Sequence, residues 1–154
     1  MSTFSPMSLR VRSAEPADRA IVHALLTAQM IEHQLPAEPA RIGRGLDAAF
    51  RAGSPAWVLL ADRDGKPVGV LLANQIVSVE KGGETLWIEE LYVTPEARRT
   101  GVARAILAHV LEEARRQGLR ALDLEVVRTQ AAAFALYRAA GFREVARDRL
   151  TLDL

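Results

Sequence analysis

The segment that joins residues 85–93 to the helix starting at Val102 constrains this chain more than any other. The first run is β-prone, and the helix carries its apolar residues on one face, so the segment is a strand–loop–helix connection. A helix start has free N–H groups and about half a positive charge. A connection of this kind therefore predicts a site for a phosphate or another anion.

The composition of this loop also suits an anion. Gly101 and Ala103 lack the bulk that would keep a diphosphate away from the backbone, and Arg98, Arg99 and Arg104 are expected to add mobile cations. The residues that we expect at the anion are Arg98, Arg99, Thr100, Gly101, Val102, Ala103 and Arg104. A turn eased by Gly101 and a solvated cluster of arginines is the alternative, which the preceding strand disfavours. A Walker loop is excluded because its Gly-Lys-Ser/Thr ending is missing. A dinucleotide fingerprint is excluded because its three glycines are missing.

The periodicity of apolar residues predicts the other elements. Strands are expected over residues 9–13, 57–61, 68–79, 85–93 and 121–127, with a final strand or two within 142–154. Helices are expected from residue 16 to about 30, over 42–50, from 102 to Gly118, and over 130–140; Gly43 and Gly45 predict that the second is short and mobile. Asp64 and Gly65 predict a hairpin. The result is a mixed α/β sheet with helices on both faces, in which strands 85–93 and 121–127 are parallel.

Composition limits the class of protein. The chain has 154 residues, 49% apolar and 25% charged, which predicts one globular domain over residues 9–154 after a flexible leader, residues 1–8. A net charge of +1 gives no global attraction to nucleic acid or to an anionic membrane. The lack of cysteine and of a long apolar run predicts a cytoplasmic protein without thiolate chemistry.

Two motifs resemble those of the GCN5-related N-acetyltransferases (GNAT). The family's pyrophosphate motif is Arg or Gln, two residues, Gly, one residue, and Gly or Ala; Arg98, Gly101 and Ala103 match it. Residues 136–142, Leu-Tyr-Arg-Ala-Ala-Gly-Phe, also look familial, and the likeness runs from Leu9 over nearly the whole chain. The resemblance implies a mostly antiparallel sheet whose parallel pair splays to hold acyl-CoA. It also implies transfer of an acetyl group from acetyl-CoA to the primary amine of a small molecule by direct attack.

The resemblance places the pantetheine arm of acetyl-CoA along one strand edge. Its amides would bond there to Leu91, Tyr92 and Val93 as an added strand does. The N–H group of Val93 would stabilise the oxyanion that forms on the thioester carbonyl. Gln130 stands where the family often has an Asn that binds this arm, so a longer amide is expected to take that role.

Proton transfer is assigned to three residues. A free amine with a pKa near ~10.4 must lose a proton before it attacks. Resemblance to polyamine-type members with an acidic pair makes Glu89 the expected base and Glu90 the reserve, because strand alternation sends the two to opposite faces. A solvent-facing glutamate is the alternative. Tyr137 matches the family's acid for the leaving thiolate; the alternative is an aromatic packed beside Phe134.

The acceptor is expected to bind near the first two helices. Glu32 and His33, with Glu90, would help to select the substrate in a pocket built by residues 30–52; the alternative is that Glu32 and His33 are simply solvated. No metal is expected, because His23 and His109 lack partners at ligand spacing. Three alternatives stay open: a protein or peptide amine as acceptor, a coenzyme A sensor without catalysis, and a homodimer formed through a last strand at residues 149–154.

Overall fold

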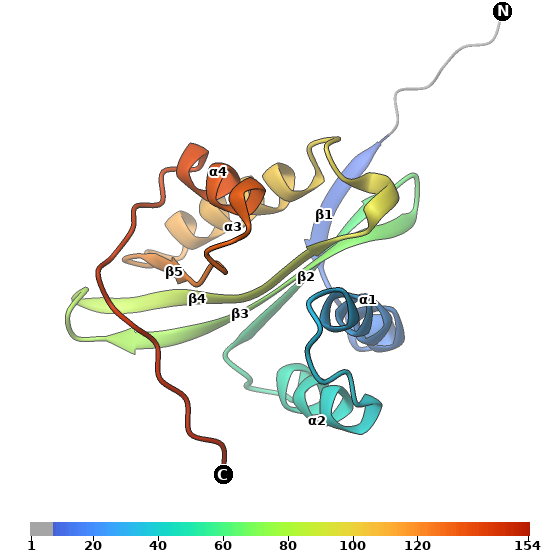
Figure 1. Cartoon of the computed structure of the whole chain (residues 1–154), viewed down its shortest axis with the longest axis horizontal. Helices are drawn as coiled ribbons and strands as arrows, with labels where there is room; N and C mark the ends of the chain where they lie inside the picture. The colour runs from blue at the N-terminus through green and yellow to red at the C-terminus, as the bar shows by residue number, and fades with distance from the viewer. Residues whose placement is uncertain (1–7) are drawn as a thin grey trace, which may run out of the picture.

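The computed structural model describes residues 8–154, so the predicted leader lies outside the described residues apart from Ser8. A single five-stranded sheet runs through the molecule, with helices on both of its faces (Figure 1). In chain order, the elements are β1 (Leu9–Ser13), the 3₁₀ turn η1 (Pro16–Asp18), α1 (Arg19–Glu32), α2 (Pro39–Phe50), β2 (Ala56–Arg63), β3 (Lys66–Ser78), β4 (Gly83–Val93), the 3₁₀ turn η2 (Pro95–Ala97), α3 (Val102–Arg116), β5 (Leu122–Leu124) and α4 (Ala131–Ala139).

The sheet has the predicted mixed topology. Its strands lie in the order β1-β2-β3-β4-β5; the first four are antiparallel, and β5 is parallel to β4. The β2–β3 connection is the predicted hairpin, because Asp64 and Gly65 have φ values of 51° and 79°. Two positive φ values in succession are typical of the tight turn that matches strand twist.

Two apolar cores separate the sheet from its helical layers. On one face α1 and α2 cover a core that contains Val22, Leu46 and Leu60. On the other face α3 packs on a core that contains Leu71 and Ile106, and α4 joins it through partly buried residues. The second helix is longer than expected, because Ile42 and Leu46 anchor it to the sheet core in spite of its glycines. The prediction of helices on both faces is confirmed.

An extra residue in β4 changes the direction of the side chains that follow it. Leu72 on β3 pairs with Glu90 while Ala73 pairs with Ile88, so Glu89 is the additional residue of a β-bulge. Ile88 packs in the core beneath α3, whereas Tyr92 packs in the core beneath α1. Uninterrupted alternation would place both on one face. The expectation that Glu89 and Glu90 point to opposite faces is therefore wrong, and both line one cavity.

The parallel pair separates after three residues. Its pairing covers Leu86, Trp87 and Ile88 of β4, and β5 ends at Leu124, earlier than the strand predicted over residues 121–127. Within residues 8–154, no strand pairs with β4 on this side after Ile88. The predicted splay of the two strands is confirmed.

The prediction of strands after residue 142 is wrong. Residues 142–154, all described, contain no strand. Ion pairs from Arg147 to Glu80 (3.1 Å) and from Arg149 to Glu125 (2.8 Å) hold this segment. Leu150 and Leu152 are 93% and 84% exposed, because this segment does not pair with an edge of the sheet in spite of its alternating pattern. The strand on which the predicted dimer was based is thus absent. Among the described helices, none is long and apolar enough to cross a membrane.

Candidate active site

The loop before α3 presents unpaired backbone N–H groups. Gly101 precedes the helix in a left-handed conformation (φ 87°), and no side chain caps the helix start. Ala105 is the first helical residue whose N–H group forms a bond, to the Gly101 carbonyl at 3.0 Å. Among residues 8–154, no acceptor bonds to the N–H groups of residues 99–104. Six free donors at the positive end of a helix can hold an anion, as the sequence predicts.

Arg98 fixes this loop to the end of α1. Its Nε donates to the Val93 carbonyl at 3.0 Å, and its guanidinium pairs with Glu32 at 2.6 Å. The guanidinium also lies 5.5 Å from the centre of the Tyr92 ring. This pairing lowers the pKa of the Glu32 carboxyl below its ordinary value. The expectation of a mobile cation is wrong for Arg98, because three contacts hold it against α1 and β4.

A cation that the sequence analysis missed stands beside the loop. Arg63, at the end of β2, donates to the Thr100 hydroxyl at 2.8 Å. The Thr100 hydroxyl in turn donates to the Ala97 carbonyl. No local pattern signals this contact, because the hairpin brings Arg63 to a loop far along the chain. The side chains of Arg99 and Arg104 make no ion pair with any described residue.

The edge of β4 leads into the loop. The N–H group of Thr94 bonds to Val68 on β3, so alternation turns the N–H groups of Val93 and Leu91 toward the opposite, open edge. The N–H group of Tyr92 turns toward β3. An extended chain that lies beside β4 finds donors at Leu91 and Val93, and the turn η2 separates these from the six free N–H groups of residues 99–104.

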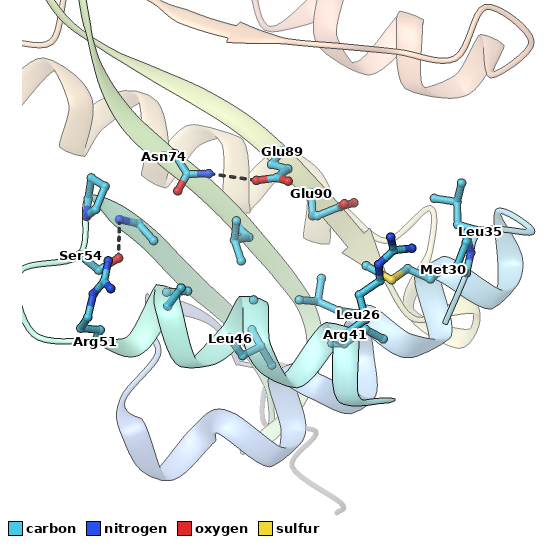
Figure 2. Close-up of a pocket in the computed structure, with 18 residues that line it drawn as sticks. Leu26, Met30, Leu35, Arg41, Leu46, Arg51, Ser54, Asn74, Glu89 and Glu90 are labelled. Atoms are coloured by element: carbon cyan, nitrogen blue, oxygen red, sulfur yellow. Dashed lines mark hydrogen bonds between the residues drawn. The ribbon is translucent and has the colours of Figure 1, made fainter. Parts of the chain in front are cut away.

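Glu89 and Glu90 differ in environment although they are neighbours. Figure 2 shows both carboxylates at one cavity, where the Asn74 amide donates to Glu89 at 2.9 Å. Glu89 is exposed and Glu90 is half-buried. Burial, and then the charge of Glu89, raise the pKa of Glu90 to about 7, while hydrogen bonding from Gln29 opposes the rise. A carboxyl with this pKa gains and loses a proton near neutral pH.

Gln29 is a second residue that the sequence analysis missed. It is 4% exposed, and its Oε1 has no hydrogen-bond partner among the described residues. A signal was available: with Val22, Leu25 and Leu26 it completes an i, i+3, i+4, i+7 stripe on the buried face of α1. A polar residue in that stripe is buried next to Glu90.

Tyr137 lies on α4, within electrostatic reach of Glu90. Burial, and then the negative charge of Glu90, raise the pKa of the Tyr137 hydroxyl to about 12. Its ring packs edge-on against Phe142, with 5.7 Å between the ring centres. The hydroxyl therefore stays protonated over the neutral range.

The C-terminal end of α1 and the N-terminal end of α4 lie next to each other. Gln130, the residue before α4, has its amide nitrogen 3.5 Å from Nε2 of His33. Two contacts thus tie the C-terminal end of α1 to later parts of the chain. Glu32 pairs with Arg98 in the loop before α3, and His33 contacts Gln130 at the start of α4. Glu32 and His33 are not among the residues that line the cavity described below.

The cavity lies between α1, α2 and the strands, with a volume of about 550 Å³ (Figure 2). Most of its lining comes from residues 30–52, the segment that was expected to build the acceptor pocket. Leu26, Leu46 and Leu72 make it largely apolar. No group of three or more metal-binding side chains occurs in the described part of the chain.

Comparison with known proteins gives the family. Residues 20–142 match the model of the acetyltransferase (GNAT) family, so the chain belongs to this family. The [ribosomal protein bS18]-alanine N-acetyltransferase of Escherichia coli (strain K12) is 38% identical over 76 residues, which are 49% of this chain and 50% of that protein. The chain thus spans about half the length of the curated relatives that it matches.

Solved structures share the whole fold. A possible acetyltransferase from Clostridium difficile 630 superposes with a TM-score of 0.83 at 17% identity, over 95% of this chain and 97% of that one. The aminoglycoside N-acetyltransferase AAC(6')-Iy in complex with CoA gives a TM-score of 0.80 at 19% identity, over 99% of both chains. At these identities the likeness shows the fold, which is the GNAT-like fold predicted from the sequence.

Proposed function

We propose that the chain is an acetyl-CoA-dependent N-acetyltransferase that acetylates the primary amine of a small molecule by direct attack. One observation carries this proposal: the open edge of β4 is followed, after the 3₁₀ turn η2, by six unpartnered N–H groups in the loop and the first turn of α3. A linear cofactor with amides at one end and a diphosphate at the other fits this order of donors. Membership of the GNAT family supports the same conclusion.

The residues present fit coenzyme A. The N–H groups of residues 99–104 would hold the diphosphate, and the side chains of Arg99 and Arg104 would add charge. Leu91 and Val93 would bond to the pantetheine amides, with Gln130 as a further amide partner near the start of α4. Acetyl-CoA supplies the acetyl group as a thioester. The N–H group of Val93, turned to the open edge, is placed to donate to a carbonyl oxygen there.

Glu90 is the better candidate for the base. Its pKa of about 7 lets a large fraction act as carboxylate at neutral pH while it remains basic enough to accept a proton. Glu89 is exposed and already accepts a bond from Asn74, which suits it to hold an ammonium group at the cavity. We therefore assign proton removal to Glu90 and binding of the amine to Glu89, reversing the order that the sequence favours.

Tyr137 is the candidate for the acid. Its hydroxyl is protonated at neutral pH, and it lies on α4 within electrostatic reach of Glu90. The acid would thus come from α4 and the base from β4. This arrangement separates proton removal at the amine from proton delivery at the sulfur.

Release of free thiol from acetyl-CoA with a panel of primary amines tests this function. We expect turnover with at least one amine, with a fall of roughly 10²-fold or more for Glu90→Gln and a smaller fall for Glu89→Gln. Binding of coenzyme A without turnover of any small amine or peptide amine would favour a sensor instead. Turnover with peptides alone would replace the small-molecule acceptor by a protein one.

A further inference from the structure

The cavity is a groove along one face of α2. Ile42, Gly45, Leu46 and Ala49 follow each other at the spacing of one helical face, and all four line it. Leu72 of β3 forms part of the facing wall, beside the two glutamates. A bound molecule that extends away from Glu90 therefore lies against apolar side chains.

The charges of the groove are distributed unevenly. In the described chain, its only acidic lining residues are Glu89 and Glu90, which lie together on β4. Arg41 and Arg51 also line it and make no ion pair with any described residue. They stand ten residues apart at the two ends of α2, about 15 Å along the helix. Figure 2 shows both arginines rising from the α2 side of the cavity, with Arg51 directed toward Ser54 and Arg41 toward the side on which Glu90 lies.

We infer that the acceptor is an amine with a single positive charge and an apolar body, such as an aliphatic or aromatic monoamine. The inference rests on the proposed function and names its substrate class. The ammonium group pairs with Glu89 and Glu90, and the body fills the groove over α2. A second ammonium group farther along the groove would meet leucines or an arginine, and in the described chain no further carboxylate lines the groove to compensate its charge. A polyamine therefore fits this groove poorly, although the acidic pair suggests one in the sequence.

Two amines of equal size separate these alternatives. Heptylamine and 1,6-diaminohexane have the same number of heavy atoms, and they differ by a methyl group in place of the second ammonium group. We expect kcat/KM, measured by thiol release, to favour heptylamine by at least about tenfold. A preference for the diamine overturns the inference but leaves the transferase function standing. Absence of thiol release with both amines, and with the wider panel, contradicts the function itself.

Charge reversal at the rim tests the reason for the preference. The double variant R41E/R51E should bring the ratio of the two kcat/KM values toward one, because it supplies acids for a second ammonium group. Arg44→Glu is the matched control: Arg44 is also an exposed arginine of α2, but it does not line the groove. An unchanged ratio in the double variant, or the same change in Arg44→Glu, contradicts the inference.

A filled groove gives a test that is independent of charge. A Cβ atom at Gly45 would meet no atom within 4 Å, so Gly45→Phe can be accommodated by the helix while its ring occupies the groove. We expect kcat/KM for heptylamine to fall by at least about tenfold while that for propylamine changes far less. Equal losses of kcat/KM for the two amines would show that the alkyl chain of the substrate does not lie along α2.

Discussion

Tyr137 on α4 lies within electrostatic reach of Glu90 on β4, since the carboxylate adds to burial in raising the pKa of the phenol to about 12. The pKa of Glu90 is itself raised to about 7, by burial and then by Glu89. At neutral pH the phenol therefore keeps its proton, whereas the carboxyl readily gains and loses one. A base and an acid for one reaction need this difference.

The pH dependence of turnover should report Glu90. Only the carboxylate form accepts a proton, so kcat/KM should rise with pH through a midpoint near 7, the pKa of Glu90. Glu89→Gln should keep a limb of this kind, at a lower midpoint because the neighbouring charge is gone. Glu90→Gln should lose it. A limb that disappears in Glu89→Gln and persists in Glu90→Gln would return the base role to Glu89.

Glu90 should also make stability depend on pH. Its pKa is higher in the folded chain than in the unfolded one, so its contribution to the free energy of unfolding is fully present below the unfolded pKa and is lost as pH rises through about 7. Denaturant unfolding at pH 5 and pH 8.5 measures this. The stability of Glu90→Gln relative to the parent should increase between these pH values, by about 2 kcal/mol, because solvent screens part of the effect at a half-buried carboxyl. An equal difference at both pH values would contradict the raised pKa.

Gln29 should lower the pKa of Glu90 through hydrogen bonding. Gln29→Met removes the amide but keeps an unbranched side chain of similar length in the buried stripe of α1. The rising limb of kcat/KM should then move to higher pH, because the carboxylate loses a donor. Asn74→Ala is the control, since Asn74 bonds to Glu89. An unmoved limb in Gln29→Met, with the variant folded, would assign Gln29 to packing alone.

Two glycines allow the backbone of the anion loop to be tested against a matched site. A Cβ atom meets nothing within 4 Å at either Gly45 or Gly101, but only Gly101 has a positive φ, 87°. Gly101→Ala should lower the free energy of unfolding by about 1 kcal/mol, whereas Gly45→Ala should raise it by up to about 1 kcal/mol. Unfolding curves of the two variants should therefore shift in opposite directions. A stabilised Gly101→Ala would show that this conformation is not required.

Local patterns predicted most of the fold. The hairpin depends only on the adjacent residues Asp64 and Gly65, and in the run from Arg98 to Ala103 the glycine directly precedes the helix. What failed depends on partners distant in the chain. The bulge at Glu89 arises from pairing with Leu72 and Ala73 on another strand, so its effect on side-chain direction is invisible in β4 alone.

The residues proposed for the site came from the sequence, whereas several of their contacts did not. The acidic pair, Tyr137 and the anion loop were all named from the sequence. The tie between Arg98 and Glu32 joins residues of α1 and the later loop, which no spacing rule connects. The C-terminal segment shows the opposite error, because alternating leucines predict a strand but cannot supply the partner edge that a strand needs.

Calorimetric titration with coenzyme A tests the central claim most directly, because it measures whether the β4 edge and the loop of residues 99–104 together hold a linear, phosphorylated ligand. We predict micromolar or tighter binding of coenzyme A and far weaker binding of pantetheine, which lacks the phosphates. Absence of binding at millimolar coenzyme A, or equal affinity for pantetheine, would contradict the account.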